Sequence, residues 1–259
     1  MTTLLFEQIQ PLYLLNKDKS RLSNGDWSWI TNMMNAFNQY CFEPSLIIVQ
    51  RKSHFQPIKS RLKLQRYADL RSIEFIPLLS FFKCIPEYQN LSSEIKTYLI
   101  QQNLRFVGIL HATEYMKTSA NMPWEGDYSL FQYIHGDELL SKMEHGIRLL
   151  KLILQDPVIT RLLLIILLFT TSLSITIVNN IYSTSHTFSS NIFHIQNYYL
   201  KLLWNYMKYR LDERTAICMF SMLISRYMHV QTIGYDIDQN FLDRPDLSEI
   251  THLIKAIEF

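Results

Sequence analysis

Glycine and proline are scarce in this chain. Only 6 of its 259 residues are glycine and 8 are proline, whereas glycine alone averages about 7% of protein residues. Few turn-forming residues imply few turns and therefore long secondary-structure elements. Helices are the longer kind of element, so the composition predicts an all-α protein of one or two domains.

Short motifs that mark common enzymes are also missing. The glycines are isolated from one another, which excludes the closely spaced glycine loops that bind nucleotide phosphates. The chain has no His-Glu-x-x-His pair and no Gly-x-Ser-x-Gly turn, so it lacks the usual metalloprotease and hydrolase signatures. We therefore expect a protein that is not an enzyme.

Cysteine and charge exclude further classes. Cys41, Cys84 and Cys218 lie too far apart for a zinc finger or a disulfide framework, which favours a reducing compartment. The first residues lack a basic leader followed by an apolar stretch, so we expect no signal peptide. A net charge of +2 does not predict direct contact with nucleic acid.

Apolar residues recur at helical spacing in several segments of the chain, such as 27–37 and 220–227. The run 118–136 breaks this period and contains Pro123, Gly126 and Gly136, so we expect one small β-element near residues 124–134. Residues 1–20 indicate a tail or a short leading helix. Helices are expected over about 26–42, 62–83, 92–116, 137–154, 157–178, 192–210 and 212–235.

The segment Leu162–Val178 has no charged residue in seventeen positions. A bilayer core needs about 20 apolar residues, with a minimum near 17. Five of the seventeen are serine or threonine, which favours a central helix buried inside a helical domain. A membrane-associated helical protein built around this segment is the alternative.

Residues 81–100 have the sequence FFKCIPEYQNLSSEIKTYLI, which resembles the signature of a known protein family. They are similar to the signature of nuclear receptor ligand-binding domains, which matches here at Phe81, Phe82, Lys83, Ile85, Pro86, Tyr88, Leu91, Leu99 and Ile100. The chain departs from that signature at Ile95, Lys96, Gln101 and Phe106.

The resemblance implies an antiparallel three-layer helical sandwich over residues 21–259 with a small β-element and an internal ligand cavity. It implies a ligand-responsive or orphan regulator of transcription in the nucleus, without the zinc module that binds DNA. It also implies a homodimer or heterodimer through the helix Met219–Val230. No metal or cofactor is expected beyond a small lipophilic ligand.

The resemblance further assigns residues to two sites. One is a groove that binds Leu-x-x-Leu-Leu helices of coregulator proteins, an instance of helix-in-groove recognition. Its residues are Lys83 and Gln101 at one end, and Leu247, Glu249 and Ile250 at the other. The ligand cavity is expected to be lined by Arg71, Glu74, Phe75, Leu78, Ile109, His111, Tyr115, Trp124, Phe131, Leu164 and Leu168.

Overall fold

The computed structural model describes residues 22–44, 60–118, 128–170 and 186–244. Every regular element in these ranges is helical, which confirms the all-α prediction for them. The elements are α2 (Asn24–Phe37), a π-helical turn η1 (Asn38–Phe42), α4 (Ser60–Phe82), α5 (Pro86–Gln89), α6 (Ser93–Thr118), α7 (Tyr128–Ile153), α8 (Pro157–Leu168), α9 (His186–Arg210) and α10 (Glu213–Leu242).

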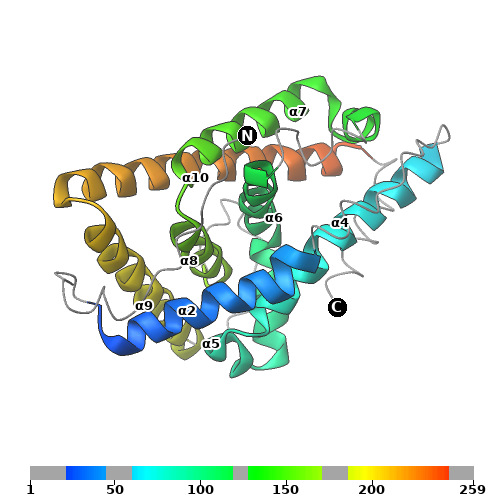
Figure 1. The fold of residues 1–259 in the computed structure, drawn as a ribbon. Helices are drawn as coiled ribbons and strands as arrows, with labels where there is room; N and C mark the ends of the chain where they lie inside the picture. The colour runs from blue at the N-terminus through cyan, green and yellow to red at the C-terminus, as the bar shows by residue number, and fades with distance from the viewer. Residues whose placement is uncertain (1–21, 45–59, 119–127, 171–185, 245–259) are drawn as a thin grey trace.

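The short helix α8 lies at the centre of the molecule (Figure 1). It packs against α6, α9 and α2. The long helices α7 and α10 lie side by side along one edge, and α9 runs away from the start of α10 (Figure 1). The α4 helix contacts η1 and reaches both α6 and α7.

The central position of α8 follows from its composition. Ten of its 12 residues are buried, because a helix that is apolar on every side has no face to turn toward water. Asp156 caps its start by accepting a hydrogen bond from the Val158 amide at 2.9 Å. The same carboxylate accepts from the Tyr206 hydroxyl at 3.1 Å and pairs with Arg210 at 3.4 Å, which ties the start of α8 to α9.

The far end of α8 is satisfied by a neighbouring helix. The Asn103 side-chain amide, on α6, donates to the carbonyl oxygens of Leu168 at 3.0 Å and Thr170 at 2.8 Å. The last carbonyls of a helix have no partner within the helix. Asn103 is buried and supplies that partner where water does not reach.

A buried arginine joins α8 to α2. The Arg161 guanidinium donates to Asn38 Oδ1 at 3.0 Å and to Met34 Sδ at 2.8 Å. Its central carbon lies 4.5 Å from the centre of the Phe37 ring, a cation–π arrangement that strengthens when water is excluded.

The small β-element expected near residues 124–134 is not confirmed. Residues 128–134 are helical, with Leu130, Phe131 and Ile134 buried on one face, and residues 119–127 lie outside the described ranges. Gly136 has φ 72° and ψ 167°, so it kinks α7 in a conformation that is essentially restricted to glycine. The sequence prediction mistook this break within a helix for a hairpin turn.

The described part of Leu162–Val178 is enclosed by protein. Residues 162–170 are buried apart from the half-buried Leu163, and residues 171–178 lie outside the described ranges, as does the predicted tail 1–20. Within the described residues, no helix has both the length and the apolar character that crossing a bilayer requires.

We predict that Asn103→Ala lowers the free energy of unfolding by about 1–3 kcal/mol, because it leaves two buried carbonyls without a donor. Urea denaturation followed by circular dichroism measures this change. The control is Asn191→Ala at an exposed position of α9, which should change stability by less than about 0.5 kcal/mol. Equal effects of the two substitutions would contradict the assigned capping role.

Candidate functional site

A well-anchored turn follows α4. Phe81 and Phe82 have no exposed surface, and the Phe81 ring meets Phe37 edge to face with the ring centres 5.1 Å apart. The Gln89 side-chain amide donates to the Lys83 carbonyl at 2.6 Å, and the Lys96 ammonium donates to the Gln89 carbonyl at 2.8 Å. These contacts hold in place the backbone of the turn that contains Lys83.

The last two turns of α4 present a mixed apolar and basic surface. Ile76 is 56% exposed, Leu79 is half-buried and Lys83 is exposed. Their spacing of three and four residues places them on one side of the helix. The Lys83 ammonium has no hydrogen-bond or ion-pair partner among the described residues, so it is available to an incoming group.

The structure describes only part of the predicted coregulator groove. Gln101 lies on α6 and is exposed, like Lys83. Leu247, Glu249 and Ile250 belong to residues 245–259, which lie outside the described ranges. The pairing of Lys83 with Glu249 across one bound helix therefore stays a prediction.

The predicted cavity positions that are described lie in the protein core. Arg71, Glu74 and Tyr115 lie in α4 and α6, but their side chains are outside the description, as is Trp124. Leu78, Leu164 and Leu168 have no surface that a water molecule could touch, so no water-sized space adjoins them. The remaining members are almost fully buried: Phe75, Ile109, His111 and Phe131.

His111 contacts a cysteine. Its Nε2 lies 3.1 Å from Cys41 Sγ of η1, and its ring meets Phe37 edge to face with the centres 6.1 Å apart. Burial lowers the pKa of His111 from 6.5 to about 4, because the charged imidazolium is poorly solvated there. This histidine is therefore neutral at physiological pH and joins η1 to α6.

A second buried polar pair escaped the sequence analysis. The Tyr67 hydroxyl lies 3.0 Å from His135 Nε2, which joins α4 to α7. The rings of Phe131 and Phe241 surround the pair, with centres 5.3 Å from Tyr67 and 5.9 Å from His135, respectively. The pair is separated by 68 residues in sequence, so no local spacing could have revealed it.

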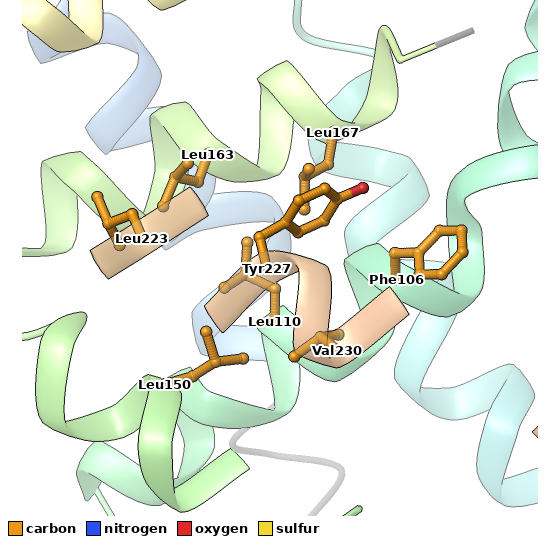
Figure 2. Close-up of a pocket in the computed structure, with 8 residues that line it drawn as sticks. All are labelled: Phe106, Leu110, Leu150, Leu163, Leu167, Leu223, Tyr227 and Val230. Atoms are coloured by element: carbon orange, nitrogen blue, oxygen red, sulfur yellow. The ribbon is translucent and has the colours of Figure 1, made fainter. Parts of the chain in front are cut away.

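A small cavity lies elsewhere, among α6, α7, α8 and α10. Its volume is about 20 Å³, enough for one water-sized molecule but not for a steroid-sized ligand. Figure 2 shows the Tyr227 ring among aliphatic side chains, and Gln231 donates to the Tyr227 hydroxyl at 3.2 Å. None of the predicted ligand residues lines it; the lining residues are Phe106, Leu110, Leu150, Leu163, Leu167, Leu223, Tyr227 and Val230.

Comparisons with known proteins find no match, either among protein-family models or among curated proteins. The described residues also contain no group of three or more His, Cys, Asp or Glu side chains that could hold a metal ion. The candidate site is therefore defined by geometry alone. Its strongest element is the exposed surface formed by Ile76, Leu79 and Lys83.

We predict that His111 makes stability depend on pH. Because the pKa of His111 is about 4 in the folded protein and about 6.5 when unfolded, only the unfolded state binds this proton between those values. The free energy of unfolding should therefore fall as the pH is lowered from about 6.5 to 4, by about 3 kcal/mol in total from this group.

Urea denaturation at pH 7, 6 and 5 measures the effect. His111→Leu should flatten the dependence, whereas His194→Leu at an exposed position of α9 should leave it as in the wild type. A wild-type slope in His111→Leu would show that other groups cause the dependence.

Proposed function

We propose that this chain is a nuclear-receptor-like ligand-binding domain that regulates transcription in the nucleus by binding a short amphipathic helix of a coregulator protein. On this proposal the helices form a three-layer antiparallel sandwich, and the domain contacts neither nucleic acid nor membrane directly and performs no catalysis. The support comes from the all-α fold, from the signature resemblance over residues 81–100, and from the surface at the end of α4.

The surface formed by Ile76, Leu79 and Lys83 carries the proposal. An amphipathic helix binds a groove through apolar residues spaced three and four apart, and Ile76 and Leu79 offer an apolar surface of matching spacing. The exposed fraction of Ile76 is 56%, which is large for an apolar side chain.

The electrostatics of Lys83 favour the same ligand. The C-terminus of a helix carries a partial negative charge and unpaired carbonyls, so a nearby ammonium stabilises it by about 0.3–1 kcal/mol when exposed. A lysine that served only its own helix would meet the last carbonyls of α4. The Lys83 carbonyl instead accepts from Gln89 at 2.6 Å, and the ammonium has no partner within the described residues.

The filled interior supports the orphan form of the proposal over the ligand-responsive form. Leu78, Leu164 and Leu168 leave no surface for a ligand atom to contact, and Tyr67 and His135 occupy space between α4 and α7. A small lipophilic ligand would have to displace these side chains, and close-packed cores resist displacement.

We predict that Lys83→Glu weakens binding of a Leu-x-x-Leu-Leu peptide by roughly ten-fold or more, because a carboxylate would repel the carbonyl end of the peptide helix. A charge-assisted hydrogen bond is worth about 1.5–3 kcal/mol. Fluorescence polarisation of a labelled peptide measures the dissociation constant, and circular dichroism confirms that each variant is folded.

Two further variants sharpen this test. Ile76→Asp should also weaken peptide binding, since it removes the apolar contact. Lys201→Glu makes the same charge change at an exposed position of α9 and should leave binding within about two-fold. Equal peptide affinity for wild type and Lys83→Glu would rule out the coregulator function and leave only a fold-level resemblance.

A further inference from the structure

Two histidines from different helices lie side by side at the surface. His145 of α7 and His229 of α10 have ring centres 6.2 Å apart, with the ring planes at 88° to one another. His145 is exposed and His229 is half-buried. We call these two residues the histidine pair.

Neighbouring contacts between α7 and α10 hold the histidine pair in place. The two helices lie side by side (Figure 1), and the Lys142 ammonium donates to the Asp236 carboxylate at 3.2 Å. Gly146 lies where a Cβ atom would come within 2.6 Å of Ile233 Cδ1, so the helices approach closely beside the pair. Side chains from both helices are therefore within reach of one small ligand.

One nitrogen of the histidine pair is buried without a hydrogen-bond partner. His229 Nε2 has almost no contact with solvent, and no group of the described residues bonds to it. His145 does not serve as that partner, because ring centres 6.2 Å apart hold the two sets of ring nitrogens beyond hydrogen-bond distance. Buried polar atoms are nearly always paired, so an exception points to a bound water or ion.

The spacing of the two rings suits a metal ion between them. A coordinating imidazole nitrogen lies about 1.1 Å from its ring centre and forms a bond of about 2.0–2.1 Å to zinc. Two imidazole rings on one zinc ion therefore have their centres about 5–6.4 Å apart. The observed separation of 6.2 Å lies within this range.

The nearby carboxylates already have partners. Glu138 and Asp236 form ion pairs with Lys142, and Glu144 forms one with Arg148. Coordination at the histidine pair therefore falls to the two imidazoles. Imidazole ligands suit zinc, copper and nickel, whereas magnesium and calcium take oxygen ligands.

We propose that the histidine pair binds one divalent transition-metal ion of the zinc type, which joins α7 to α10. His229 supplies Nε2 from the protein side, His145 supplies a ring nitrogen from the solvent side, and water completes the coordination. Because His145 is exposed, its ring can turn to admit the ion. This inference stands apart from the coregulator function, whose surface lies on α4.

Isothermal titration calorimetry of the full chain with Zn²⁺ tests the site. The wild type should bind one ion through the histidine pair. His145→Gln and His229→Gln should each raise the dissociation constant for this ion at least ten-fold, since each removes one of its two protein ligands. Replacement of the exposed His145 leaves the core intact, and circular dichroism confirms that each variant is folded.

The matched control is His194→Gln, at an exposed position of α9, which should leave the dissociation constant within about two-fold of the wild type. Equal zinc affinity for wild type and His145→Gln would overturn the proposal and leave a water molecule as the partner of His229.

Electron paramagnetic resonance with Cu²⁺ as the probe identifies the ligands, because coordinated nitrogens split the copper signal. The wild type should show two imidazole nitrogens and His145→Gln only one. Identical spectra of the two proteins would show that copper is held elsewhere and would contradict the proposal.

Thermal unfolding tests whether the ion joins the two helices. An ion that binds only the folded state raises the melting temperature. Excess Zn²⁺ should raise it by several degrees in the wild type and by less than about one degree in His145→Gln, and Mg²⁺ should change neither protein. Equal zinc-induced shifts in the two proteins would show that the ion binds away from the α7–α10 contact.

Discussion

The rest of the structure depends on one constraint, which is that α8 has no polar side. A helix of this kind must be surrounded, and α2, α6 and α9 surround it. Its main polar groups are the backbone groups at its two ends and the Arg161 guanidinium. Asp156, which caps the first end, accepts from Tyr206 of α9, and Asn103 of α6 donates to a carbonyl at the last end. Arg161 donates to Asn38 of η1. Burial of α8 thus fixes the mutual positions of three other helices.

The described core is tightly packed, so candidate binding surfaces lie on the outside of the protein. The Tyr67–His135 and Cys41–His111 pairs place polar groups in the core, and the two members of each pair lie within hydrogen-bond distance of one another. Hydrogen bonds between buried polar groups help to make a core specific. Exposed apolar side chains lie instead near Lys83 at the end of α4 and along α10.

Apolar enrichment and helix boundary signals were sufficient to predict most helices. The helix expected over 62–83 is observed at Ser60–Phe82, before Pro86, and the one over 92–116 is observed at Ser93–Thr118, after Ser92. Predictions failed where the local signal was ambiguous. In the sequence Gly136 indicates a turn, but in the structure it lies at a kink within α7. The α10 helix continues to Leu242, beyond the expected end at residue 235. The Tyr67–His135 contact and the cavity lining depend on tertiary contacts, which no local pattern encodes.

The sequence order of α8 and its cover has a consequence during synthesis. The α6 helix precedes α8 in the chain, but α9, which covers another side of it, is complete only at Arg210, 42 residues after α8 ends at Leu168. At about 5–20 residues per second, translation takes roughly 2–8 s to supply that cover. Throughout this interval the emerging chain displays an apolar helix, with Arg161 as its one charged side chain, before all of its cover is made, so the yield depends on the chaperones that shield such segments.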